Sequence, residues 1–346
     1  MTFAPQGLTL LSPCKLNLCL YVLGPRPDGF HNLQSVFTPL DFGDTMVVRP
    51  GTDAAAAFAQ LSASNQQAAA TARTYVTLDG AGQVVPPPQA TPCVQTRESV
   101  TLVSTSALNF PLEHNLIYRA VKLLEATCQR PLTVTIGLDK RIPMGGGLGG
   151  GSSNAATTLL ALNAIFELGL TTAQLAHLGA QLGSDVPFFV HGTSALVEGR
   201  GELITPLNLA PQSYLVVTPR CHVSTKEIFT APELKRHYSA PRQPSEVVSQ
   251  LYCNDLVPVV TEKFCEIGHT LDILVKYGHP AMSGTGASCF VACPDAATAQ
   301  HWFEELTQHG SSLGLACGAT VFWTRAVSPS LTIQALSQVK GESRVR

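Results

Sequence analysis

The sequence predicts a mixed α and β fold with enough residues for two domains. Strand-like apolar runs and amphipathic helical segments alternate along its 346 residues. A chain of this length can bury a sizeable core and exceeds the usual size of one domain. A strand-like segment at 133–138 and a helical segment at 154–166 flank a glycine-rich loop. Glycine there indicates that the backbone adopts positive φ or closely approaches a ligand.

Composition narrows the class of protein. Apolar residues make up 45% and charged residues 13%, with a formal net charge of −2, so we expect no nucleic-acid partner and no anionic membrane partner. Ten cysteines are scattered without C-x-x-C or zinc-ligand spacing, which is typical of reduced thiols in a cytoplasmic protein. The N-terminus resembles no signal peptide, and no run approaches the roughly 20 apolar residues of a membrane helix.

The N-terminal segment predicts strands at 8–11 and 16–22. Lys15 therefore stands at a strand start, followed by Asn17, and an ordinary surface lysine is an equally good interpretation of this local context. A turn-rich loop at 24–33 then presents Phe30 and His31. These rings suit stacking and edge hydrogen bonding with a flat base, although a loop aromatic that covers the core is the simpler alternative.

Residues 51–108 are rich in Ala, Gln, Thr, Ser and Pro, with strand-like pieces only at 74–78 and 100–103. We interpret them as a low-complexity insertion in a surface loop. An amphipathic helix is expected at 113–125, with Leu116, Ala120, Leu123 and Leu124 facing inward.

The loop between Pro143 and Ser153 is the most informative stretch, because six of the nine residues at 143–151 are glycine. Ser152 and Ser153 are suitable N-caps for the helix that follows, whose free N–H groups and dipole would face a bound anion. The dinucleotide-binding pattern matches only weakly, since Pro143 separates strand from loop and no acid-ended strand follows. The Walker pattern fails, because no Lys-Ser or Lys-Thr follows the glycines. A flexible linker is disfavoured, because the loop leads directly into a capped helix.

Further candidates lie in the second half of the chain. A helix at 173–182 leads to Asp185, which stands between a glycine turn and a proline-led apolar run, and an Asx-turn is the alternative for it. We expect a strand at 214–218, a helix after 224, a loop at 231–246, a helical region at 254–277 and a frayed end from 340. A second glycine turn lies within 282–291, and taken alone it would be interpreted as a tight turn between a helix and a strand.

Taken in this order, the motifs resemble the GHMP kinase superfamily, which includes galactokinase, homoserine kinase and mevalonate kinase. The glycine loop, the 183–187 Gly-Ser-Asp-Val-Pro motif and the second glycine turn carry this resemblance. The segments 13–18, 28–33 and 40–44 resemble, more narrowly, the family of 4-diphosphocytidyl-2-C-methyl-D-erythritol kinases. Cys14 and Phe30 replace that family's usual Ala and Tyr, so any contact made by the tyrosine hydroxyl is missing.

The resemblance implies a two-domain α+β fold. Residues 1–196 would form an ATP-binding domain of ribosomal-protein-S5-like topology, with the insertion at about 51–108, and 197–346 a ferredoxin-like substrate domain. It implies ATP-dependent phosphorylation of the 2-hydroxyl of diphosphocytidyl-methylerythritol in the non-mevalonate isoprenoid pathway. Mg²⁺ would bridge the phosphates without a metal site built from protein ligands. The partner would be a small molecule with a cytidine diphosphate group, and the enzyme a cytoplasmic monomer or homodimer.

By the same resemblance, Asp185 is the catalytic base and Lys15 its partner. The implied ATP-binding residues are Asn115, Lys140, Pro143, Met144, Gly145, Gly146, Gly147, Leu148, Gly149, Gly150, Gly151, Ser152 and Ser153. The implied substrate-binding residues are Asn17, Phe30, His31, Thr225, Gly284, Thr285 and Gly286.

Three alternatives remain at the level of sequence. Another GHMP kinase would have no need of a base-binding loop at 28–31, and a non-catalytic nucleotide-binding regulator would have no need of both Lys15 and Asp185. A dinucleotide-dependent oxidoreductase rests on the weak glycine match alone.

Overall fold

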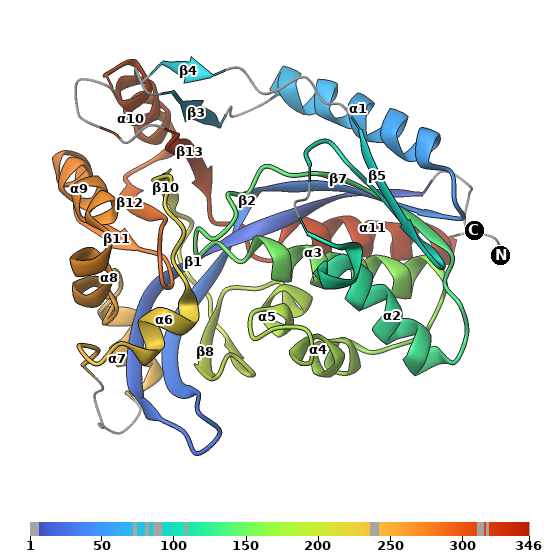
Figure 1. Ribbon diagram of the computed structural model, residues 1–346, viewed down its shortest axis with the longest axis horizontal. Coiled ribbons are helices and arrows are strands. Elements are labelled where there is room, and N and C mark those ends of the chain that lie inside the picture. The colour runs from blue at the N-terminus through green and yellow to red at the C-terminus, as the bar shows by residue number, and fades with distance from the viewer. Residues whose placement is uncertain are drawn as a thin grey trace.

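The computed structural model describes residues 7–71, 75–79, 83–85, 92–107, 110–235, 242–309, 315 and 318–345. Two β-sheets with flanking helices make up this part of the chain (Figure 1), which confirms the mixed α and β class. None of its helices is both long and apolar enough to cross a membrane.

The first sheet is built around two long antiparallel strands. Its strands are β1 Leu8–Pro25, β2 His31–Pro50, β5 Cys93–Arg97, β6 Val100–Ser104, β7 Val134–Asp139, β8 Ala195–Gly199 and β9 Leu203–Pro206. Strand β2 pairs with β1 along one edge, and with β8 and then β7 on successive parts of the other. The break expected at residues 12–15 is only a register shift, because β1 continues through Pro13 and Lys15.

Helices cover both faces of this sheet (Figure 1). Helices α2 Leu116–Cys128, α3 Gly150–Ile165, α4 Thr172–Ala180, α5 Val186–His191 and α11 Leu331–Val345, with the short 3₁₀ helix η1 Leu112–His114, belong to one side. Successive residues of a strand point to opposite faces, so Met46 and Val48 join the core under α2 and α3, while Val47 packs against α1. The end expected to fray from residue 340 is helical as far as Val345.

The segment 51–108, which we interpreted as a surface loop, in fact contributes to both sheets. Helix α1, Ala54–Thr71, packs its fully buried Ala57 and Leu61 against Val47. Strand β6 confirms the strand predicted at 100–103 and lies fully buried beside β7, while β3 Val76–Leu78 pairs with the second sheet. The interpretation failed because an alanine-rich composition also suits a closely packed helix. Residues 72–74, 80–82, 86–91 and 108–109 lie outside the described part.

The second sheet has the order β11-β12-β10-β13-β3-β4. Its other strands are β10 Ser213–Thr218, β11 Pro280–Met282, β12 Cys289–Cys293, β13 Thr320–Arg325 and β4 Val84–Val85. Its helices are α6 Thr225–Thr230, α7 Pro244–Ser249, α8 Val257–Lys263, α9 Cys265–Leu274, η2 Val275–Tyr277 and α10 Ala296–His309. The predicted strand at 214–218 and the helical region at 254–277 are confirmed. The expected 231–246 loop ends where α7 begins, and its residues 236–241 lie outside the described part.

The last strand of the first sheet ends at Pro206, and the second sheet's strand β10 begins at Ser213. The domain boundary at residue 196 remains a prediction.

Candidate active site

The glycine loop has the backbone geometry of an anion cradle. Gly145, Gly147 and Gly149 have φ values of +71°, +72° and +72°, with residues of ordinary φ between them. Alternation of this kind turns neighbouring N–H groups toward one concavity. The glycines are also sterically required, since a Cβ on Gly147 would lie 2.2 Å from the Ser283 carbonyl oxygen.

Helix α3 begins earlier than the sequence suggested. Its N-cap is Gly149, so Ser152 and Ser153 lie in the first turn and the expectation that they cap the helix is wrong. The left-handed Gly149 ends the loop there. A larger residue in place of Gly150 would be crowded, because its Cβ would lie 3.0 Å from Lys140 Nζ. The free N–H groups of this helix start face the loop's concavity.

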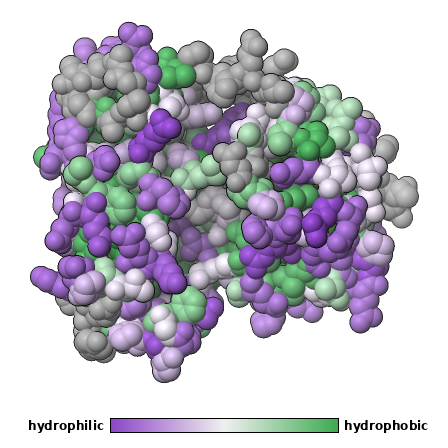
Figure 2. Space-filling view, viewed as in Figure 1, coloured by the Kyte–Doolittle hydropathy of each residue, from purple (hydrophilic) through white to green (hydrophobic). Residues whose placement is uncertain are grey.

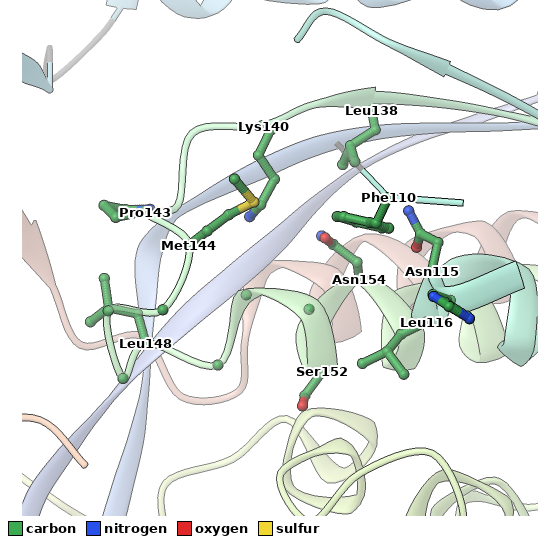
Figure 3. A pocket seen from close by; sticks show the side chains of 17 residues that line it. Phe110, Asn115, Leu116, Leu138, Lys140, Pro143, Met144, Leu148, Ser152 and Asn154 are labelled. Carbon is green, nitrogen blue, oxygen red and sulfur yellow. The ribbon is translucent and has the colours of Figure 1, made fainter. Parts of the chain in front are cut away.

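A cavity of about 350 Å³ lies between the loop, α3 and the start of α2 (Figure 3). It brings together most of the expected ATP-binding residues, including Asn115, Lys140 and the loop from Pro143 to Ser152. Ser153 does not line it, because its buried hydroxyl lies 2.8 Å from Ser12 Oγ. Sequence reasoning missed five other lining residues, which are Phe110, His114, Leu116, Leu138 and Asn154.

The hydrogen bonds of Asn115 and Lys140 fix two of the expected ATP-binding residues in the cavity wall. The Asn115 side chain caps α2 by accepting a hydrogen bond from the Ile117 N–H at 2.9 Å. Lys140 extends from the end of β7 (Figure 3), with its Nζ 2.6 Å from Asp44 Oδ2. Phe110 stands next to the low-complexity segment, where no periodicity marked it as a site residue.

Lys15 and Asp185 meet beside the glycine loop. Lys15 Nζ lies 3.6 Å from Asp185 Oδ2 and donates to Asn17 Oδ1, and the Lys15 N–H donates to the Leu148 carbonyl at 3.1 Å. Lys15 is only 3% exposed, so the surface-lysine interpretation is wrong. Burial lowers the pKa of Lys15, and Asp185 opposes that shift.

Asp185 is placed by the backbone that precedes α5. Its side chain is 30% exposed and makes no capping hydrogen bond with that helix. The carboxylate therefore faces Lys15, not its own backbone as in the Asx-turn alternative, and is accessible from solvent.

The second glycine turn packs directly on the first. Ser283 Oγ donates to the Gly147 carbonyl at 3.0 Å, and the Ser288 N–H donates to the Gly146 carbonyl at 3.1 Å. Gly284 and Gly286 have φ values of +60° and +86°. The turn joins β11 to β12, and not a helix to a strand as in the alternative interpretation.

Asn254 holds this turn and was missed as a site residue. Its Nδ2 donates to the carbonyls of Met282 and Gly284, both at 2.8 Å. In the sequence it indicated only the opening of a helical region.

Three of the expected substrate residues, Thr225, Thr285 and His31, lie in or beside α6. Thr225 and Thr285 hydroxyls are 3.2 Å apart, and the His31 ring centroid lies 5.3 Å from that of Phe229. The Phe30 ring is 51% exposed, and the Arg200 guanidinium carbon lies 4.4 Å from its centroid. Figure 2 shows the surface hollowed between the side that carries α6 to α9 and the side that carries α2 to α5.

Comparison with known proteins decides the family. The family model described as GHMP kinases N terminal domain matches residues 115–193. The 4-diphosphocytidyl-2-C-methyl-D-erythritol kinase of Alcanivorax borkumensis is 38% identical over 340 residues, covering 97% of this chain and 95% of the relative. The chain belongs to this family. The enzyme of the same name from Marinobacter nauticus is 36% identical and covers 96% and 99% of the two chains.

Solved structures agree with the fold. A crystal structure of 4-(cytidine 5'-diphospho)-2C-methyl-D-erythritol kinase matches with a TM-score of 0.66 and 28% identity, over 93% of this chain and all of that one. Homoserine kinase from Cytophaga hutchinsonii, at 13% identity, shares the fold with a TM-score of 0.59 over 95% of this chain and 98% of that one. The GHMP kinase fold and family expected from the motifs are therefore confirmed.

Acidic, histidine and cysteine side chains are the usual protein ligands of metal ions. Among the described residues, no three of them lie close enough together to hold a metal ion.

Proposed function

We propose that this protein transfers the terminal phosphoryl group of ATP to the 2-hydroxyl of 4-diphosphocytidyl-2-C-methyl-D-erythritol. The observation that carries the proposal is the position of the Lys15–Asp185 pair directly against the phosphate-binding loop, through the Lys15 N–H to Leu148 carbonyl bond. The family membership supports this substrate and its place in the non-mevalonate isoprenoid pathway.

In this proposal the protein acts mainly by positioning and by charge. The N–H groups of the glycine loop and of the α3 start would hold the phosphates of ATP, with Lys140 at the side of the cavity. Mg²⁺, when bound, would neutralise charge that develops on the phosphate oxygens.

Asp185 would accept the proton of the acceptor hydroxyl as that oxygen bonds to the terminal phosphorus and ADP leaves. Lys15 would orient the carboxylate and stabilise negative charge on the transferring group. Asn17, which accepts from Lys15 and donates to Ser35 Oγ at 3.0 Å, fixes the direction of that ammonium.

The cytidine end of the substrate would bind near α6. Phe30 offers an exposed ring face for stacking, and His31 and Phe229 form an adjacent aromatic pair. Thr225, Gly284, Thr285 and Gly286 would contact the substrate from the second glycine turn and α6. The proposal also includes action in the cytoplasm, which the scattered cysteines support, as a monomer or homodimer.

The test measures ADP release by purified protein with ATP and Mg²⁺. Separate reactions contain diphosphocytidyl-methylerythritol, mevalonate, homoserine or galactose, with Asp185→Ala as the control variant. Release with the cytidyl substrate alone, lost in the variant, is the expected result. Release with another acceptor would contradict the substrate, and full activity of the variant would contradict the role of Asp185.

A further inference from the structure

The segment Leu40 to Asp44 of β2 is a sequence motif that the proposed reaction does not account for. Asp44 within it is fully buried and saturated with donors. Its Oδ1 accepts from the N–H groups of Arg141 and Ile142, both at 2.8 Å. Its Oδ2 accepts from Lys140 Nζ at 2.6 Å and from Asn154 Nδ2 at 2.9 Å. One carboxylate thus binds the segment that enters the phosphate-binding loop and the helix that follows it.

The Lys140 ammonium needs such a partner where it stands. It lies against the first residue of α3, since a Cβ on Gly150 would be 3.0 Å from Nζ. The N-terminus of a helix carries partial positive charge, which repels a cation. The Asp44 carboxylate offsets that repulsion and keeps the ammonium at the wall of the cavity (Figure 3).

The backbone contacts of Asp44 have a separate effect. By accepting from two consecutive N–H groups, the carboxylate fixes the direction in which the chain leaves β7 and enters Pro143. Asn154 links the same carboxylate to α3, and through Ser12 Oγ at 3.0 Å to strand β1. The Asp44 carboxylate therefore holds both the start of the loop and the helix at its end.

We propose that Asp44 is a positioning residue for ATP, which it does not itself touch. It sets the place of the Lys140 ammonium and the path of the phosphate-binding loop. Asp44 is 0% exposed and does not line the cavity, so it acts through Lys140 and the backbone. This inference rests on the proposed use of the cavity for ATP.

The chain provides a matched control three residues earlier on the same strand. The Asp41 side chain is 6% exposed and accepts from Thr324 Oγ1 at 2.9 Å, the Arg325 N–H at 2.8 Å and Arg325 Nε at 2.9 Å. These partners lie on β13 of the second sheet and not around the cavity. Asp41→Asn therefore also weakens a buried carboxylate of β2, without changing the cavity.

The test compares Asp44→Asn with Asp41→Asn. An asparagine oxygen can still accept from the two N–H groups, but its NH₂ group would face the donors of Lys140 and Asn154. Calorimetric titration with ATP, without acceptor, should give at least a tenfold weaker Kd for Asp44→Asn and a change below twofold for Asp41→Asn. In steady-state assays the KM for ATP should rise in parallel with Kd, while the KM for the acceptor stays within twofold.

A second comparison isolates the effect of Asp44 on ATP binding that depends on Lys140. Lys140→Met should itself weaken ATP binding. Adding Asp44→Asn to Lys140→Met should then reduce the ATP affinity by a smaller factor than Asp44→Asn does in the wild-type protein. If circular dichroism shows that Asp44→Asn does not fold, Asn154→Ala removes a single donor and should weaken ATP binding about threefold.

Folded Asp44→Asn with wild-type ATP affinity would overturn the inference, and so would an equal loss in Asp41→Asn. If Asn154→Ala stands in for Asp44→Asn, unchanged ATP affinity in that variant would do the same. Because the titration contains no acceptor, an error in the proposed substrate would leave the result intact. Wild-type protein that binds no ATP would overturn both the inference and the proposed function.

Discussion

Gly147→Ala is the substitution whose effect the structure defines most sharply. The new methyl group would lie 2.2 Å from the Ser283 carbonyl oxygen and 2.8 Å from that of Gly286. Both are backbone atoms of the second glycine turn, so neither can rotate away as a side chain would. One of the two turns must move.

Two separate effects determine how much Gly147→Ala loses in stability and in kcat/KM. A left-handed backbone costs a non-glycine residue roughly 1–2 kcal/mol, and Gly147 has a φ of +72°. The contact itself is more than about 1 Å shorter than carbon–oxygen packing normally allows. A displacement of about 1 Å in a positioned site can reduce the rate by about 100-fold, and we expect that loss in kcat/KM.

Gly169→Ala separates these two effects. Gly169 has a φ of +71°, and a Cβ there would meet nothing within 4 Å. The free energy of urea unfolding of Gly169→Ala should therefore fall by the roughly 1–2 kcal/mol that backbone strain costs, while its rate of ADP release stays unchanged. Equal stability and equal turnover in the two variants would refute the reasoning that the clash with the second turn matters.

Three further predictions follow from how far single side chains are buried or exposed. Burial lowers the pKa of Lys15 below 10.5, so the unfolded chain holds that proton more tightly and stability rises with pH as Lys15 deprotonates. Lys15→Met should be more stable than wild type near neutral pH, and lose this advantage as pH approaches 10.5 in parallel urea titrations. Phe30→Ala should raise the KM for the cytidyl substrate about tenfold through lost stacking, with unfolding unchanged because the ring is 51% exposed. Leu61→Ala should reduce the free energy of urea unfolding by about 2–5 kcal/mol, since Leu61 is fully buried; an effect near zero would restore the surface-loop interpretation of α1.

The sequence by itself determined the features that depend on local chemistry. Six glycines within nine residues specify close approach and positive φ wherever the chain places them, and three of them have that φ. The turn that carries Asp185 and the following proline-led helix are equally local. The order of these motifs along the chain was enough to predict the family.

Only the tertiary structure decided which of these features meet. Lys15 and Asp185 come from distant parts of the chain, and no periodicity indicates that β1 passes beneath the glycine loop and buries that lysine. The two glycine turns contact each other only because the two sheets adjoin there.

The same holds for α1, β6 and Asp44. An alanine-rich segment can be a loop or a packed helix, and here the apolar face of β2 that carries Val47 is covered by the helix. Asp44 stands out in the sequence only as part of a motif, because its four donors come from a strand end, a loop and a helix that folding brings around one carboxylate. Hydrogen-bond partners that are distant in sequence are set by packing, which local residue patterns do not encode.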